Sequence, residues 1–376
     1  MNLIIKQLEL YIFHIYVILK KLQRLLVKGL DEIKKQLLIL LGNGFTIDLL
    51  HHMGQKDKID VVNLFNQGDR VPWLADNEAG FLSFKRCPNL WNLGARPNNH
   101  DNECASNITE NIISCANTFA YSKKVTPSLS EDSIYIRAYK ELCAYLKYLF
   151  IYYNDKVNDK ELETLSEWGW YKLFSLIKNK GNELFESVTF ITYNYDIWLE
   201  RILLYMQIPF NISGITYNED ALINIVKPHG SISFQSKRLL DNSAFKINYN
   251  RDLFGGTLDE LNVEYSQLYV NSTINAMIPP SGESSKFSAN WSQNLHKIAK
   301  EQASSLIPDD EVIMCGLSYW HVDRTEIDDI LISIDNEVNF KMFNPVPPPT
   351  LNAVISSIFK NYVAYTNSDI LGGFYE

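Results

Sequence analysis

QLLILLGNGFTIDLL, residues 36–50, carries the strongest structural signal in the chain. Its first six residues are almost wholly apolar, and a Gly-Asn-Gly turn follows at residues 42–44. A short apolar run that ends in a glycine-rich turn and continues into a helix is typical of a buried strand in a parallel sheet. This stretch therefore predicts the first strand and the first helix of an α/β fold.

The pattern of an apolar strand followed by a polar turn recurs later in the chain. Between two of these strands, apolar residues at helical spacing in 323–336 predict a helix, with Asp323 and Glu326 as its capping box. Strands alternating with helices predict a Rossmann-like, doubly wound parallel sheet. The expected strands and their turns are 188–193 before Asn194-Tyr195-Asp196, 224–227 before Pro228-His229-Gly230-Ser231, 311–315 before Gly316-Leu317-Ser318, and 338–343 before Asn344-Pro345, with a further helix at 351–358 and a last strand at 362–366.

The length of 376 residues allows two or three domains, or one large domain with an insertion. Between the first two strands lies a long region rich in Asn, Tyr, Trp and Cys, whose later part has Tyr and Leu at helical spacing. We expect an N-terminal helical segment at 1–35, a Rossmann domain at 36–65 and 186–376, and a mainly helical insertion at 66–185.

The N-terminal segment is the one place where a membrane has to be considered. Residues 8–19 read LELYIFHIYVIL, an apolar run of about a dozen positions that Glu9 and His14 interrupt, whereas a spanning helix needs about 20 apolar residues. Basic residues then follow at intervals between leucines. This pattern predicts an amphipathic helix that packs on the body or on another subunit, and contact with a membrane surface stays open.

Charge and cysteine usage narrow the function classes. Asp plus Glu exceed Lys plus Arg by 44 to 35, which gives a net charge of −9 and makes phosphate-mediated nucleic-acid binding a poor expectation. The five cysteines are scattered and form no C-x-x-C pair, so neither a disulfide framework nor a zinc site is indicated. We expect a reduced, cytoplasmic setting, no bound metal and no membrane span.

The Gly42-Asn43-Gly44 turn has two interpretations. Glycine lets the backbone approach a phosphate closely, and the start of the following helix attracts anions. The full G-x-G-x-x-G fingerprint is absent, because Ile47 stands where the third glycine would be. On this motif alone, a tight strand-to-helix turn without a ligand is an equal alternative.

Three polar residues at strand ends are candidates for chemistry. His229 stands between Pro228 and Gly230, where we expect it to be exposed in a crevice and able to act as a general base. A structural histidine is the alternative. Asn194 could orient a water or a sugar hydroxyl, while Asp196 could either bind a ligand or cap the helix beside it.

Taken in order, these motifs resemble the SIR2-like domain of bacterial anti-phage defence proteins. The resemblance covers residues 36–370 and lies in the combination of the motifs rather than in any one of them. The motifs are GNGFT at 42–46, TYNYD at 192–196, KPHGS at 227–231, IPP at 278–280 with Lys286 and Trp291 downstream, CGLSYWHVD at 315–323 and FNP at 343–345.

The resemblance implies a Rossmann-like NAD-binding fold and cleavage of NAD at the nicotinamide–ribose bond. It implies that His229 is the catalytic histidine and that Asn194 places the water or the ribose. The residues that it assigns to NAD binding are Gly42, Asn43, Gly44, Phe45 and Thr46 in the first turn, Asp196 in the T-x-N-x-D motif, Gly316 and Ser318 in the second phosphate-side turn, and Asn344 at the adenosine ribose.

Two departures separate this chain from sirtuin-type protein deacylases. It lacks their two zinc-binding C-x-x-C pairs, and HHMGQKDKID at 51–60 stands where they carry a segment with Phe and Arg. Water is therefore the expected acceptor, which predicts an NAD glycohydrolase that releases nicotinamide and ADP-ribose. The alternatives are a non-catalytic NAD- or ADP-ribose-binding regulatory subunit, an NAD-dependent deacylase and, least favoured, a dehydrogenase.

The resemblance also implies the biological setting. NAD depletion would serve antiviral defence by abortive infection in the bacterial cytoplasm. Unregulated NAD loss is lethal, so we expect activity to be controlled by assembly, as a homo-oligomer and with a HerA-type hexameric ATPase as partner.

Overall fold

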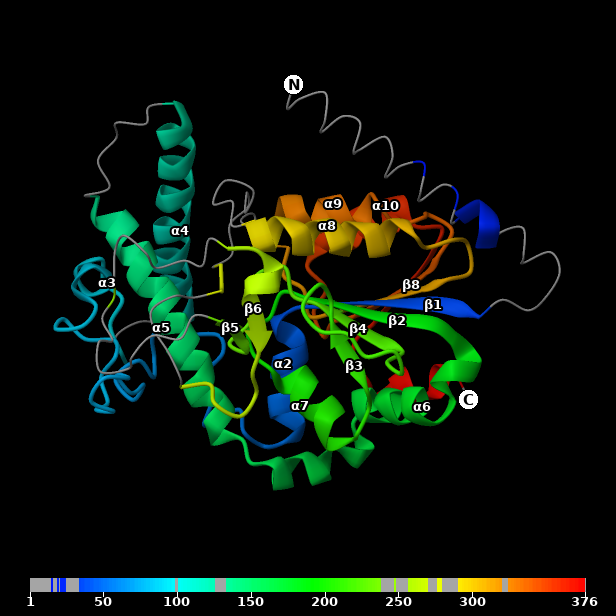
Figure 1. Cartoon of the computed structure of the whole chain (residues 1–376), viewed down its shortest axis with the longest axis horizontal. Coiled ribbons are helices and arrows are strands. Elements are labelled where there is room, and N and C mark those ends of the chain that lie inside the picture. The colour runs from blue at the N-terminus through cyan, green and yellow to red at the C-terminus, as the bar shows by residue number, and fades with distance from the viewer. Residues whose placement is uncertain are drawn as a thin grey trace.

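The computed structural model describes residues 15, 19, 21–24, 34–98, 101–125, 133–237, 247, 256–269, 276–278, 290–319 and 324–375. Within them, seven parallel strands form one sheet in the order β3-β4-β2-β1-β7-β8-β9 (Figure 1). This confirms the predicted α/β, Rossmann-like fold. The strands are β1 (Lys35–Leu41), β2 (Phe185–Thr192), β3 (Phe210–Ile212), β4 (Ile223–Val226), β7 (Glu311–Cys315), β8 (Asn339–Phe343) and β9 (Asn361–Tyr365).

The order of the strands reverses next to β1. On one side of β1 lie β2, β4 and β3, which the chain forms first, and on the other side lie β7, β8 and β9, which it forms later. The switch point therefore lies between β1 and β7, and ligands of open parallel sheets bind at such a point, beyond the carboxyl ends of the strands.

The central strands are buried because their sequences are apolar on both faces. Leu37 to Leu41 are each at most 2% exposed, and Ile39 lies in register between Phe190 of β2 and Ile313 of β7. Burying one such side chain contributes about 1.5–3 kcal/mol. The run that predicted the fold thus forms the centre of the core.

Helices cover both faces of the sheet (Figure 1). The layer of α8, α9 and α10 lies on one face, and α2, α6 and α7 lie on the other. Their bounds are α2 (Asn43–His52), α6 (Gly169–Leu184), α7 (Trp198–Tyr205), α8 (Asn290–Ser304), α9 (Arg324–Leu331) and α10 (Pro349–Ile358). A final 3-10 helix, Asp369–Tyr375, packs against α6.

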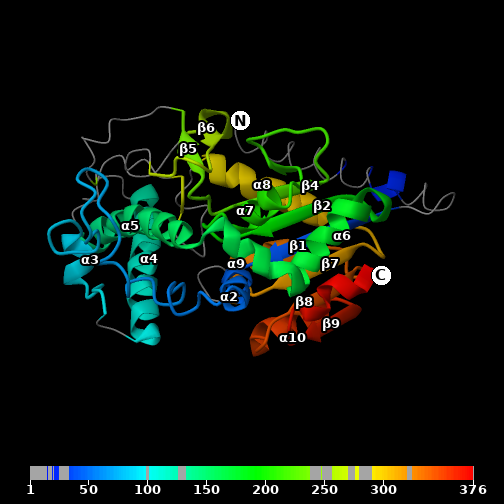
Figure 2. The ribbon, with the colours of Figure 1, turned by 90° about the horizontal axis from the view of Figure 1, so that it is seen from below.

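The insertion between β1 and β2 forms a helical lobe beside the sheet (Figures 1 and 2). Its helices are α3 (Pro88–Asn92), α4 (Asn102–Val125) and α5 (Ile134–Lys156), and a 3-10 helix, Asp159–Glu167, leads on to α6. The lobe reaches the sheet through aromatic contacts, since Phe150 of α5 lies 5.6 Å from Tyr195, which follows β2.

Some elements differ from the sequence expectation. The helix expected at 323–336 ends at Leu331, and Ile334 is buried in the turn that follows it. Asp323, its expected cap, lies outside the described residues. The strands β3, β5 (Phe234–Ser236) and β6 (Leu261–Val263) went unpredicted because three residues are too few to show a period.

Little of the N-terminal segment falls within the described residues. Residues 21–24 are helical, and Arg24 forms ion pairs with Asp310 at 2.7 Å and Glu186 at 2.9 Å. This end of the segment is therefore held on its own subunit. Among the helices that the structure describes, none is long and apolar enough to cross a membrane.

Candidate functional site

The turns after β1 and β7 touch at the switch point. The N–H of Gly42 donates to the carbonyl of Cys315, and the N–H of Gly44 donates to the carbonyl of Gly316, each at 3.0 Å. A Cβ atom on Gly44 would lie 2.3 Å from the Cα of Gly316, whose φ is +61°. Only glycine fits this contact, so both glycines are required where the two backbones meet.

This contact also limits how the first turn can bind a phosphate. The N–H of Gly44 is bonded to Gly316, and the N–H of Phe45 donates to the carbonyl of Gly42 at 3.0 Å. Because these two donors are engaged, the turn offers a dinucleotide mainly the positive end of α2.

Asn194, Thr46 and Asp196 form one directional chain of hydrogen bonds. Asn194 Nδ2 donates to Thr46 Oγ1 at 3.1 Å and to the carbonyl of Gly42 at 3.0 Å. Thr46 Oγ1 in turn donates to Asp196 Oδ2 at 2.7 Å. The structure therefore brings together residues that lie about 150 positions apart, from the first turn of α2 and from the turn after β2.

These bonds fix the orientation of the Asn194 amide. Both of its N–H donors are used, and Oδ1 accepts no hydrogen bond from the residues that the structure describes. Asn194 is only partly buried. Its Oδ1 is therefore a fixed acceptor beside the glycine contact, able to bind a hydroxyl group or a water.

Asp196 lies below Asn194 and Thr46 and is 5% exposed. Its carboxylate accepts hydrogen bonds from both α2 and α7. Its Oδ1 accepts from the N–H of Trp198, the first residue of α7, at 3.3 Å, while Oδ2 accepts from Thr46 of α2. Ile197, not Asp196, is the N-cap residue of α7, so the alternative that Asp196 caps this helix is not met. Burial raises the pKa of Asp196, and the nearby Lys227 partly offsets this. Asp196 therefore positions Thr46 and Asn194 from below.

A buried ion pair supports the same group. Lys227, which follows β4, donates to the carbonyl of Asp196 at 2.5 Å and to Glu200 Oε1 at 2.7 Å, and both side chains of the pair are 1% exposed. Burial raises the pKa of Glu200, and Lys227 counteracts it. We call Thr46, Asn194, Asp196, Glu200 and Lys227 the Lys227 network.

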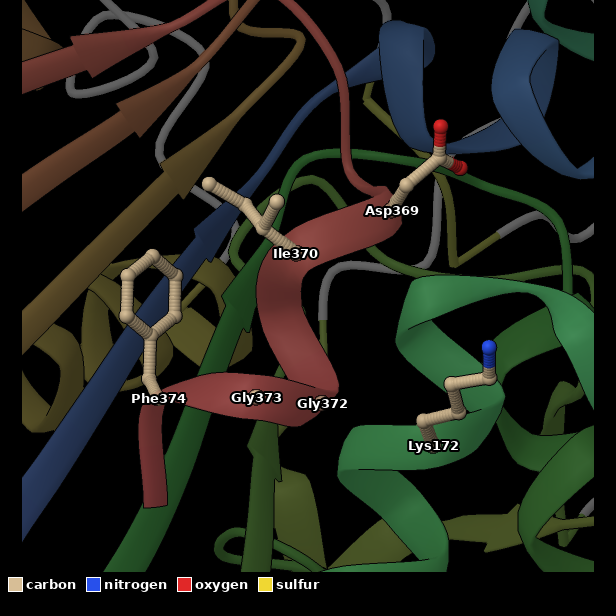
Figure 3. A pocket seen from close by; sticks show the side chains of 6 residues that line it. All are labelled: Lys172, Asp369, Ile370, Gly372, Gly373 and Phe374. Atoms are coloured by element: carbon tan, nitrogen blue, oxygen red, sulfur yellow. The ribbon is translucent and has the colours of Figure 1, made fainter. Parts of the chain in front are cut away.

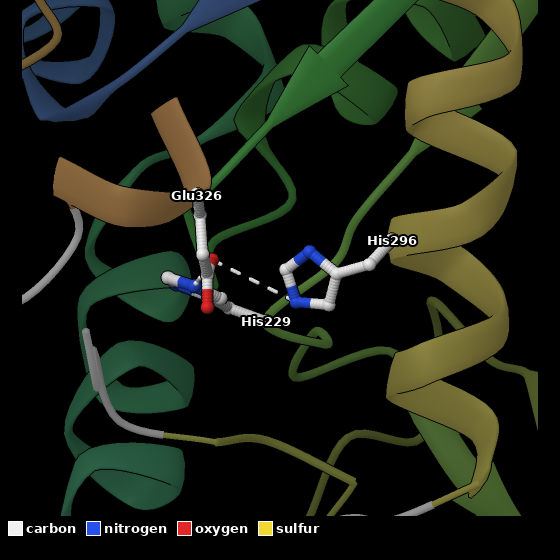
Figure 4. Close-up of side chains that lie close together, drawn as sticks. All are labelled: His229, His296 and Glu326. Atoms are coloured by element: carbon white, nitrogen blue, oxygen red, sulfur yellow. Dashed lines mark hydrogen bonds and ion pairs between the residues drawn. The ribbon is translucent and has the colours of Figure 1, made fainter. Parts of the chain in front are cut away.

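His229 lies in a second polar group, and the expectation that it is exposed is wrong. It is 1% exposed, and its Nε2 lies 2.8 Å from Glu326 Oε2 of α9 (Figure 4). His296 Nε2 of α8 lies 3.7 Å from the same oxygen. The helices α8 and α9 cover the turn, which a local sequence pattern cannot show. We call these three residues the His229 cluster.

Aromatic rings and the backbone hold His229 in place. Its ring meets that of Tyr193 edge-on at 5.0 Å and lies over that of Tyr195 at 6.3 Å. The next residue, Gly230, has φ +85°, and a Cβ there would lie 1.9 Å from the carbonyl oxygen of Ala276. Because Tyr193 precedes Asn194 in the chain, it links the His229 cluster to the Lys227 network.

The remaining predicted site residues do not join these two groups. Phe45 is 1% exposed, and its ring packs against Trp168 and Trp170 in the core. Asn43 Nδ2 donates to the carbonyl of Val61 at 3.1 Å. The other two lie at the ends of neighbouring strands: Ser318 is exposed after β7, and Asn344 Oδ1 accepts from the N–H of Val346 at 3.1 Å after β8.

A pocket also lies elsewhere on the molecule (Figure 3). Lys172 of α6 and residues of the C-terminal 3-10 helix line it, and no predicted site residue does. It therefore adds nothing to the candidate site.

Glu326 and His296 are the functional candidates that the sequence analysis missed. Glu326 lies four residues before Ile330, on the buried face of α9, and His296 lies four residues after the buried Ser292 on α8. A polar residue in the apolar stripe of an amphipathic helix is the signal that marks such positions.

No protein-family model matches this chain, and neither does any curated protein. The functional interpretation therefore depends on the geometry at the carboxyl ends of the strands.

Proposed function

We propose that this chain is an NAD glycohydrolase of the SIR2-like type, which transfers the ADP-ribose part of NAD to water and releases nicotinamide. The observation that carries the proposal is the Asn194 amide, fixed with Oδ1 as an acceptor beside the contact between Gly44 and Gly316. This acceptor, which follows β2 and is bonded to Gly42, lies next to the switch point between β1 and β7, and a ligand bound there would present a hydroxyl group to it.

The chemistry requires few groups. The bond between the ribose C1′ and the nicotinamide nitrogen breaks, the nicotinamide keeps the electron pair, and the ribose becomes oxocarbenium-like. A water then forms the new bond to C1′, and its proton passes to His229. Orientation by Asn194 and proton transfer to His229 are the protein's contributions.

The proposal includes control by assembly. Ile15, Leu19 and Leu22 of the N-terminal segment are 51%, 58% and 48% exposed, and neighbouring apolar side chains of this kind favour a protein contact. We propose a homo-oligomer that works with a HerA-type ATPase in anti-phage defence.

The test is nicotinamide release from NAD by the purified chain, alone and with the hexameric ATPase. Wild type should release nicotinamide and ADP-ribose in equal amounts, and Asn194→Ala should slow release by about 100- to 1,000-fold. NAD binding without release would support a regulatory subunit instead. Release that requires an acylated peptide would support a deacylase.

A further inference from the structure

One carboxylate oxygen in the His229 cluster faces two imidazoles from different elements. Glu326 Oε2 lies 2.8 Å from His229 Nε2 and 3.7 Å from His296 Nε2 (Figure 4). The side chains of His229 and Glu326 are 2% and 9% exposed. A polar contact this deeply buried is electrostatically stronger than one in water.

The two distances identify the hydrogen-bonded partner. At 2.8 Å the contact between His229 and Glu326 is a hydrogen bond, whereas the 3.7 Å between His296 and Glu326 is too long for one. Burial lowers the pKa of His296, which disfavours the charged form of this ring and weakens it as a competing cation for the carboxylate. Glu326 is therefore directed at His229.

An ionised carboxylate can only accept, so the bonded nitrogen must donate. We propose that Glu326 is a positioning residue that holds His229 in the tautomer with its proton on Nε2, which leaves the lone pair on Nδ1. Nδ1 is then the nitrogen that takes the proton during catalysis. The carboxylate also stabilises the imidazolium that this transfer creates.

The same three side chains match the His₂Glu donor set of catalytic zinc sites. The separation of His229 and Glu326 favours the hydrogen bond, because two ligands of one tetrahedral zinc ion would lie about 3.3 Å apart. A direct contact at 2.8 Å is shorter than this. Binding of zinc by these three side chains would overturn the proposal.

The effect of Glu326 on the tautomer of His229 can be measured without an activity assay. In the chain labelled with ¹⁵N-histidine, the imidazole nitrogen shifts of His229, assigned with His229→Gln, should show a proton on Nε2. In Glu326→Gln this preference should be lost, because an amide can either donate to the ring or accept from it. A wild-type spectrum with the proton on Nδ1, or no change in Glu326→Gln, would overturn the proposal.

The catalytic consequence rests on the proposed function. Glu326→Gln should lower kcat for nicotinamide release by about 100- to 10,000-fold with KM changed less than about twofold, and Glu326→Asp should recover part of the loss. Asp329→Asn, an exposed carboxylate on the same helix, is the matched control. Wild-type kcat in a folded Glu326→Gln chain would overturn the proposal.

Two further results separate the possible failures. A wild-type chain that releases no nicotinamide refutes the proposed function, while the nitrogen shifts still test the tautomer. Stoichiometric binding of Zn²⁺ by the wild-type chain in calorimetry, abolished by both Glu326→Gln and His296→Gln, would show a metal-ligand set and overturn the inference.

Discussion

The Lys227 network and the His229 cluster lie at the same edge of the sheet but differ in how their polar groups are matched. In the network, the ammonium of Lys227 pairs with the carboxylate of Glu200. The hydrogen bonds that run from Asn194 through Thr46 end on the carboxylate of Asp196. In the cluster, an ionisable ring faces a carboxylate, and a second ring lies just beyond hydrogen-bonding distance.

This difference indicates a division of labour. Opposite charges and directional hydrogen bonds in the network fix positions and stabilise the fold. The ring of His229 can gain and lose a proton while Glu326 stays bonded to it, and this suits proton transfer. Substitutions in the buried part of the network, which is Thr46, Asp196, Glu200 and Lys227, should therefore act mainly on stability. Substitutions of Asn194 and of the cluster should act mainly on catalysis.

The largest expected effect on stability comes from the buried ion pair. Glu200→Gln leaves the ammonium of Lys227 buried without its counter-charge and should lower the free energy of unfolding by about 3–5 kcal/mol. The matched control is Glu301→Gln, which breaks an exposed pair with Lys297 and should cost less than about 1 kcal/mol. Urea unfolding measures both, and equal losses would contradict the structural role of the network.

The contact between the two glycine turns should tolerate no side chain. Gly44→Ala forces a Cβ against the backbone of Gly316 and should cost about 1–3 kcal/mol, with weaker NAD binding because the turns separate. Gly373→Ala is the control, since a Cβ there meets nothing within 4 Å. Calorimetric unfolding with and without NAD tests this, and a Gly44→Ala chain as stable as the control would refute it.

The smallest effect should be a pH dependence in the network. Burial raises the pKa of Asp196 above 3.8, so the folded chain keeps this proton at pH values where the unfolded chain has released it. Wild-type stability relative to Asp196→Asn should therefore fall as pH rises from about 4 through the raised pKa.

Urea unfolding of both chains across this pH range measures the difference. The exposed Asp57→Asn serves as the control and should show no such slope. A wild-type curve parallel to that of Asp196→Asn would mean that folding leaves the pKa of Asp196 unchanged, which would contradict the prediction.

Much of the sheet and the positions of the residues at its strand ends could be predicted from the sequence, because short local sequence patterns indicate them. An apolar run before a glycine turn marks β1, and the same pattern placed Asn194 and Gly316 at strand ends. The partners of these residues could not be predicted, since whether Glu326 meets His229, 97 positions away, depends on how α9 rotates on the sheet. The burial of His229 was missed for the same reason.

The most direct test of this division of labour compares two variants in the same assay. Nicotinamide release and thermal unfolding are measured for wild type, His229→Gln and Glu200→Gln, with the exposed His51→Gln as control. His229→Gln, which limits the cavity that alanine would leave and keeps a donor for Glu326, should lose about 100- to 10,000-fold in rate and less stability than Glu200→Gln. Glu200→Gln should lose stability and far less rate per folded molecule. A folded His229→Gln chain that releases nicotinamide at the wild-type rate would contradict the account.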